Sequence, residues 1–145
     1  MDLSYDRKQS TGYMVNLTAR LMVRAIERRL TGGTAGPMPV FLALLNGDAQ
    51  PQKELARSAA VEQPTMANTL NRMERDGLIE RTPDPADGRS MLISLTKLGR
   101  QQAAQAMDAA TTVNALALAA LTPQERTQLL DMLQRLIGVL EQDGS

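Results

Sequence analysis

The chain of 145 residues contains no cysteine and no histidine. The absence of cysteine excludes disulfides, thiolate metal sites and thiol-based redox sensing. The absence of histidine removes the commonest general base and the commonest transition-metal ligand. The sequence also has no phosphate-binding glycine loop, no nucleophile motif and no cluster of metal ligands. We therefore expect a protein that is not an enzyme, with no catalytic residues, no metal site and no cofactor.

An excess of charge and a long apolar segment are missing as well. Sixteen basic and sixteen acidic residues give a formal net charge of zero, so the total charge does not by itself indicate nucleic-acid binding. Any affinity for DNA must therefore come from the local placement of charge. No segment is long and apolar enough to cross a bilayer, and the opening residues, MDLSYDRKQS, lack a signal-peptide core. These features predict a cytoplasmic protein.

Residues 52–96 combine two short helical patterns with two strand-like runs. Helices are predicted over 52–59 and 63–76, with Pro64 in the first turn of the second helix and Gly77 as its left-handed stop. Strands are predicted over 79–82 and 91–95. The turn formers between them make a loop longer than a minimal hairpin, in which Gly88 supplies tolerance of a positive φ. This order predicts a winged helix-turn-helix, whose second helix enters a DNA major groove while the hairpin reaches the minor groove.

Helical patterns flank this segment on both sides. They run over about 12–30 and 40–45, and then from 96 to about 120 and from 123 onward. The predicted fold class is mainly α with a small β-hairpin wing, a winged helix-turn-helix with N- and C-terminal dimerisation helices. We expect one continuous compact fold with three parts. These are 1–36, the N-terminal dimerisation helix and loop; 37–96, the DNA-binding unit; and 97–145, the long connecting helix and the C-terminal dimerisation helix.

The first and last helices are apolar over wider arcs than a small winged unit needs. The main stripe of the last helix is Leu129, Leu133, Leu136 and Leu140. Either both helices complete a monomeric helical core, or they meet a second copy in a twofold interface, which is the alternative that we favour. A homodimer would hold two recognition helices roughly 34–36 Å apart, so its operator in double-stranded DNA would be a pseudo-palindrome.

Several polar side chains of 63–76 and of the hairpin have the chemistry to read DNA. Asn68 and Asn71 carry amides that can bind adenine N6 and N7, and Thr65 can touch a thymine methyl group. The guanidinium of Arg72 suits phosphate, and that of Arg89 suits a narrow minor groove, where negative potential concentrates. The alternative is that these residues are solvated groups on a helix surface and a turn.

The segment LARSAAVEQPTMANTLNRMERDGLIERTPDPADGRSMLISLTKLG, residues 55–99, closely resembles the multiple antibiotic resistance regulator, or MarR, family. The matching motifs are Leu55-Ala56, Pro64-Thr65, the run from Arg72 to Leu78, the wing DPADGR and the helix start LTKLG. Weaker agreement covers nearly the whole chain. The resemblance implies a dimeric winged-helix transcription factor, in most members a repressor that small phenolic or lipophilic ligands release from DNA.

The resemblance also implies roles for individual residues. Asp87 and Arg89 match the family's wing Asp-x-Arg, whose arginine enters the minor groove and whose aspartate helps to hold it. Two positions depart from the pattern, since Glu62 stands where many members have a serine cap and Gly88 where many have a second wing arginine. The full set of predicted DNA contacts is Gln63, Pro64, Thr65, Asn68, Asn71, Arg72, Asp87 and Arg89.

Family geometry further suggests a small-molecule pocket between the dimer helices and the winged unit, lined by Met14, Leu17, Met38 and Phe41. The alternative is that these side chains fill the core, as thioethers at helical spacing usually do. A second function also stays open, because winged helices can serve as protein-interaction adaptors without specific DNA binding. Salt dependence separates the two functions, since binding through phosphate contacts weakens steeply as salt rises.

Overall fold

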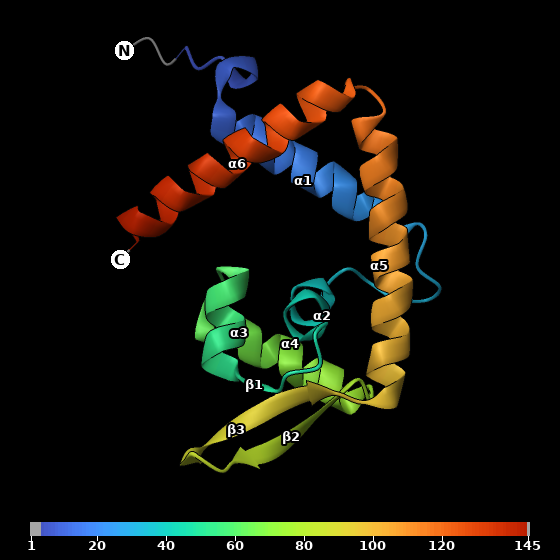
Figure 1. The fold of residues 1–145 in the computed structure, drawn as a ribbon, viewed down its shortest axis with the longest axis vertical. Helices are drawn as coiled ribbons and strands as arrows, with labels where there is room; N and C mark the ends of the chain where they lie inside the picture. The colour runs from blue at the N-terminus through green and yellow to red at the C-terminus, as the bar shows by residue number, and fades with distance from the viewer. Residues whose placement is uncertain (1–3, 145) are drawn as a thin grey trace. The chain divides into compact units, whose positions relative to one another are not determined.

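The computed structural model describes residues 4–144, which are mainly helical with one small antiparallel sheet (Figure 1). The elements follow in the order η1 (Arg7–Gln9), α1 (Thr11–Glu27), α2 (Met38–Leu44), β1 (Gln50–Pro51), α3 (Gln52–Ala59), α4 (Gln63–Arg75), β2 (Ile79–Asp84), β3 (Asp87–Leu95), α5 (Lys97–Leu118) and α6 (Pro123–Asp143). The predicted fold class is confirmed. Within the described residues, no helix has both the length and the apolar character needed to cross a membrane.

The winged unit is organised around one apolar core. It takes Val40, Phe41 and Leu44 from α2, Leu55 from α3, Met66, Leu70 and Met73 from α4, Ile79 from β2, Ile93 from β3, and Ala103 and Ala106 from α5. The three buried residues of α4 are spaced by three and four positions, which places them on one face of the helix. One face of α4 is therefore held by the core, and the opposite face is left for other contacts.

The wing is a tighter hairpin than the sequence predicts. β2 and β3 pair from Ile79 opposite Leu95 out to Asp84 opposite Asp87, so the strands run to the turn and the expected long loop is wrong. Side-chain carboxylates make the turn compact, because Asp84 Oδ1 accepts a hydrogen bond from the N–H of Ala86 at 2.9 Å. Positive φ angles occur in the described chain at Ala60, Gly32, Gly47 and Gly77, so the hairpin does not use the tolerance of a positive φ that Gly88 offers.

β1 is a strand that the sequence analysis missed. It pairs with β3, Gln50 opposite Ile93, and gives the sheet the order β1-β3-β2. Its two residues are too few to show an alternating pattern, and Pro51 is a residue that argues against a strand. Pairing with β3 at the edge of the sheet overrides that preference, and it ties the beginning of α3 to the wing.

The junction between the wing and α5 depends on a close approach of two backbone segments. A Cβ added to Gly99 would lie 1.9 Å from the carbonyl oxygen of Leu78, so only glycine fits there. Thr96 caps α5, as predicted, by accepting a hydrogen bond from the N–H of Gly99 at 3.0 Å. The N–H of Thr96 in turn donates to the carbonyl of Leu78 at 3.0 Å. This junction fixes the base of the hairpin against the start of α5.

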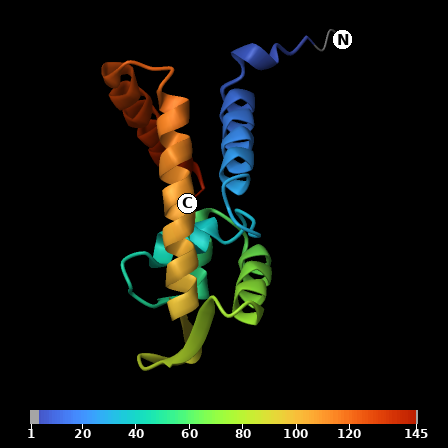
Figure 2. The same ribbon diagram turned by 90° about the vertical axis from the view of Figure 1, so that its right-hand side faces the viewer.

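The chain divides into two compact units, Met1–Ala110 and Thr111–Ser145. The first contains the winged helix-turn-helix together with α1, and Figure 2 shows the hairpin projecting at one end of this unit, as Figure 1 does. The second consists of the end of α5 and the whole of α6, which begins with the predicted capping box: Thr122 and Glu125 exchange hydrogen bonds at the first turn. The boundaries that we expect at residues 36 and 96 stay a prediction.

Candidate nucleic-acid interface

The exposed face of α4 carries most of the predicted DNA-reading residues. Met66, Leu70 and Met73 point into the core, and at 3.6 residues per turn the arc opposite to them holds Pro64, Asn68, Arg72 and Arg75, with Thr65 and Asn71 on its two sides. All of these polar positions are exposed. The helix thus presents amides, a hydroxyl group and guanidinium groups on one continuous surface.

The beginning of α4 is anchored to α3. Gln52 donates from Nε2 to the side-chain Oε1 of Gln63 at 3.1 Å and lies 3.4 Å from its carbonyl oxygen. The N-cap position is Glu62, whose side chain makes no capping hydrogen bond. A helix N-terminus favours anions through its N–H groups and dipole, so this end of α4 suits a phosphate. The carboxylate of Glu62 is a competing negative charge at the same end.

Arg89 projects from the tip region of the hairpin. It is the third residue after the Pro85–Ala86 turn, and its side chain is exposed. Its backbone N–H donates to Asp87 Oδ1 at 3.0 Å, so the aspartate of the wing motif holds the backbone of the arginine. A fixed backbone with a free guanidinium group is the arrangement that insertion into a narrow groove needs.

Arg81 is a residue of the interface that the sequence analysis missed. From β2 it donates through Nη1 to Glu74 Oε1 at 2.9 Å and through Nη2 to Asn71 Oδ1 at 3.1 Å, which joins the wing to α4. Its side chain is 22% exposed, whereas the other arginines paired with acids are about 70% exposed or more. The available signal was the three-residue spacing of Asn71 and Glu74, which puts both acceptors on one side of α4.

Arg75 forms only an exposed ion pair in this structure. Its Nε lies 3.5 Å from Asp76 Oδ1, and both side chains are more than half exposed. Such a pair contributes little free energy in water. Arg75 therefore remains available for a phosphate, beside Arg72 on the same arc.

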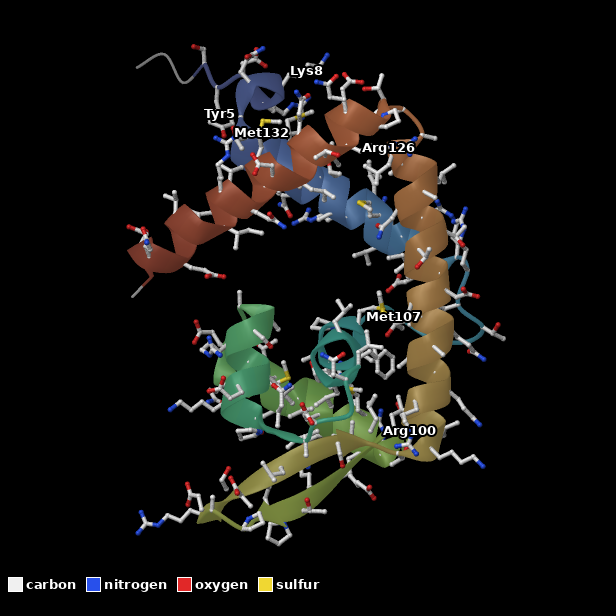
Figure 3. All side chains as sticks on the ribbon, viewed as in Figure 1. Tyr5, Lys8, Arg100, Met107, Arg126 and Met132 are labelled. Atoms are coloured by element: carbon white, nitrogen blue, oxygen red, sulfur yellow. The ribbon has the colours of Figure 1, made fainter. Side chains whose placement is uncertain are left out.

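The four predicted pocket residues do not share one environment. Phe41 lines a cavity of about 440 Å³ beside the α1–α2 connection, with Leu30, Pro37, Leu78 and Gln102 among its other lining residues. Met38 packs against the core, while Met14 and Leu17 lie exposed on α1, 45% and 39% accessible. Figure 3 labels Met107 of α5 beside α2, where it packs against the same core, and Arg100 at the start of α5, where it donates to the carbonyl of Leu95 at 3.0 Å.

A second cavity, of about 480 Å³, reaches the recognition helix itself. It is lined by Thr69, Arg72 and Met73 of α4 and, across from them, by Glu27, Thr34 and Pro37 of the α1–α2 region. Glu27 Oε1 accepts a hydrogen bond from the N–H of Ala35 at 2.9 Å, which fixes the connection on that side. Arg72 thus borders both the exposed arc and a cavity of small-molecule size.

Comparison with known proteins identifies relatives along most of the chain. The MarR family model matches residues 42–91. The chain is 26% identical to the HTH-type transcriptional repressor NicR of Pseudomonas putida, over 97% of this chain and 90% of that protein. It is 33% identical to the organic hydroperoxide resistance transcriptional regulator of Bacillus subtilis, over 72% of this chain and 71% of that protein.

Solved structures have the same fold. One of them is the structure of Bordetella bronchiseptica BpsR, which concerns the regulation of its DNA binding by 6-hydroxynicotinic acid. It superposes with a TM-score of 0.81 at 22% identity, covering 92% of this chain and 96% of that one. The likeness of the fold and the identity to the regulators above agree with the motifs in residues 55–99. The chain belongs to the MarR family of transcriptional regulators.

Proposed function

We propose that this protein is a homodimeric, sequence-specific DNA-binding repressor that a small aromatic or lipophilic ligand releases from its operator. Its partners are then pseudo-palindromic double-stranded DNA, a second copy of itself and an effector, and its place of action is the cytoplasm, where operator DNA is found. The family membership supports the regulatory function. The exposed arc of α4, the exposed apolar side chains of α1 and α6, and the cavity beside Arg72 support the DNA contacts, the dimer and the ligand.

One observation carries the DNA-binding part of the proposal. The exposed arc of α4 and the projecting hairpin with Arg89 belong to the same compact unit, tied together by the hydrogen bonds of Arg81. A helix of this kind fits a major groove, and an arginine on an adjacent hairpin fits the neighbouring minor groove. In this arrangement Asn68 and Thr65 reach base edges, Gln63, Pro64 and Arg72 lie against the backbone, and Asp87 holds Arg89.

The dimer is supported by apolar side chains that a single chain leaves exposed. On α6, Leu130, Leu136, Ile137 and Leu140 are 44–68% accessible, and no residue of that helix is buried. On α1, Met14, Leu17 and Leu21 are exposed as well. Large apolar side chains exposed in this number are typical of a protein interface, and a second copy offers the same side chains.

The ligand response is supported by the cavity that Arg72 lines. A ligand bound between α4 and the α1–α2 connection would hold this arginine, or shift the helix that carries it, and so favour a form with lower DNA affinity. The effect on DNA binding equals the ratio of the ligand's affinities for the two forms. A small aromatic acid such as 6-hydroxynicotinic acid, the compound named for BpsR, has suitable size and a carboxylate for a guanidinium group.

The test of DNA binding is selection of bound fragments from random duplex DNA, followed by titration of the selected site at several salt concentrations. We expect an enriched pseudo-palindrome, and an affinity that falls steeply and linearly with the logarithm of salt concentration. A protein-interaction adaptor would enrich no sequence and would show only weak, sequence-independent binding. That outcome would reject the proposal in favour of the adaptor.

The ligand response is tested on the same selected site. 6-Hydroxynicotinic acid is titrated into the protein–DNA complex, together with a small panel of phenolic and benzoic acids. Release of DNA, with a matching rise in the thermal stability of the free protein, supports the effector mechanism. If no compound in the panel changes either quantity, the protein represses without a ligand of this chemistry.

A further inference from the structure

The contact between Arg81 and Asn71 determines what Asn71 can present to DNA. An amide side chain has one acceptor, Oδ1, and one donor group, Nδ2, and it can read adenine by using both at once. Arginine has donors only, so the atom of Asn71 that lies 3.1 Å from Arg81 Nη2 must be the oxygen. The orientation of the amide is therefore fixed by chemistry, with its oxygen toward the wing.

Glu74 stabilises the contact between Arg81 and Asn71. It lies on the same side of α4 as Asn71 and accepts from Arg81 Nη1 at 2.9 Å, so the guanidinium group is held by two partners of one helix. The backbone of Arg81 on β2 is fixed as well, since it pairs with Ile93 of β3, one of the most buried residues of the core. Held at both ends and largely covered, Arg81 restricts the rotamers of Asn71 before any DNA is bound.

We infer that Arg81 is a specificity-determining positioning residue, which makes Asn71 a hydrogen-bond donor to the major groove. This inference rests on the proposed DNA-binding function. With Oδ1 turned to the wing, Nδ2 is the atom left to face the bases. Guanine offers two adjacent acceptors, O6 and N7, and thymine offers O4, whereas the bidentate contact to adenine needs the amide oxygen. Asn71 then favours guanine or thymine over adenine at one position of each half-site.

The test compares the DNA sites selected by four proteins: the unaltered chain, Asn71→Ala, Arg81→Met and Glu74→Gln. We expect the unaltered chain to enrich guanine or thymine at one position of each half-site, and Asn71→Ala to lose the preference at that position alone. Arg81→Met frees the amide oxygen, so adenine should gain about tenfold in relative affinity there. Glu74→Gln is the matched control, because a glutamine oxygen still accepts from Arg81 and the preference should persist.

Arg81→Lys covers the case in which Arg81→Met does not fold. An ammonium group can still pair with Glu74, but it lacks the second arm of the guanidinium group that reaches Asn71. It should therefore give the same shift toward adenine with the fold retained, as checked by thermal unfolding.

Separate outcomes overturn the inference and the proposed function. If the unaltered chain enriches no sequence, both are wrong. If it enriches a site in which Asn71→Ala changes no position, or in which the position that depends on Asn71 is already adenine, the inference alone is wrong. The same holds if the arginine variants weaken binding equally on every sequence, because a merely structural contact would act in that way.

Discussion

The wing arginine combines a fixed backbone with a free side chain. Asp87 holds the N–H of Arg89 at 3.0 Å, and the guanidinium group extends from an exposed hairpin end. Gly88 adds no second charge at this tip, so within the hairpin end a single guanidinium group is available for the minor groove. The contribution of the wing to DNA affinity should thus be concentrated in one side chain.

Arg89→Ala tests whether this one side chain provides most of the wing's contribution to DNA affinity. We expect DNA affinity to fall by roughly tenfold or more, with a shallower dependence on salt, because one charged contact is lost. Titration of the selected site at several salt concentrations measures both effects. Arg135→Ala is the matched control, since Arg135 is an exposed arginine of α6 whose pair with Asp131 contributes little to stability. Equal losses in the two variants would remove the wing from the binding mechanism.

The buried and exposed faces of α4 could be predicted from the sequence, but the contacts of its side chains with other elements could not. Helical periodicity alone separates Met66, Leu70 and Met73 from the exposed arc, because burial follows the 3.6-residue repeat. The contact of Arg81 with Asn71 joins residues ten positions apart on a strand and a helix, and no local pattern reports it. Long-range pairing of this kind depends on how the hairpin packs against α4, which only the folded chain determines.

The start of α4 combines an acidic residue with a helix end that lacks a side-chain cap. Glu62 occupies the N-cap without a side-chain hydrogen bond, and its carboxylate lies where DNA phosphates would approach. An acidic group at a helix N-terminus is favourable for the isolated helix, but it repels a bound anion. Stability and DNA affinity therefore respond differently to this residue.

Glu62→Ser should raise DNA affinity severalfold while it changes stability little. The serine adds a cap of about 1 kcal/mol, which the loss of a favourable charge at the helix dipole partly offsets. DNA titration and urea unfolding measure the two quantities. Glu62→Gln removes the charge without adding a good cap, so it should retain most of the gain in affinity. If Glu62→Ser binds no better than the unaltered chain, the carboxylate does not face phosphate.

The junction of the wing with α5 limits what residue 99 can be. Gly99 meets the carbonyl of Leu78 so closely that a Cβ would lie 1.9 Å from the oxygen, and backbone atoms cannot move aside as a side chain can. Gly99→Ala should therefore destabilise the winged unit by about 3 kcal/mol or more, the upper range for overpacking. Urea unfolding measures the loss.

Gly138→Ala is the matched control for that substitution. Gly138 lies within α6, where an added Cβ meets nothing within 4 Å, so alanine should stabilise the helix by about 0.5–1 kcal/mol. If Gly99→Ala were as stable as the unaltered chain, α5 would not pack against the start of β2 as the structure describes.

Element types and order could be predicted from the sequence, but several ends and one strand could not. Caps and stops such as Thr122 and Gly77 act locally, so they mark α6 and the end of α4 correctly. The tight wing turn depends on hydrogen bonds that two aspartate carboxylates accept from backbone N–H groups, and on the cross-strand register. β1 exists only because β3 lies beside it. Such features need partners from distant parts of the chain.

At the scale of the whole molecule, the second unit is too small to bury its own apolar surface. Leu129 and Leu133 of α6 are half-buried, whereas Leu136, Ile137 and Leu140 are exposed. The apolar positions cover one half of the helix, and the polar positions, such as Gln134, cover the other. Such a helix is stable in water when another surface covers its apolar half, and a second copy of the chain is the surface that we propose.

The double substitution Leu136→Glu and Leu140→Glu places two charges on the apolar half of α6. We expect a dimer for the unaltered chain and a monomer for this variant, because like charges would meet across a twofold interface without compensation. Sedimentation equilibrium at micromolar concentration measures the mass. DNA affinity should fall by a factor of about 10²–10⁴, since a monomer loses the second half-site contact. Gln134→Glu adds a charge to the polar half and should leave both mass and affinity unchanged. A double variant that remains dimeric would show that α6 lies outside the interface.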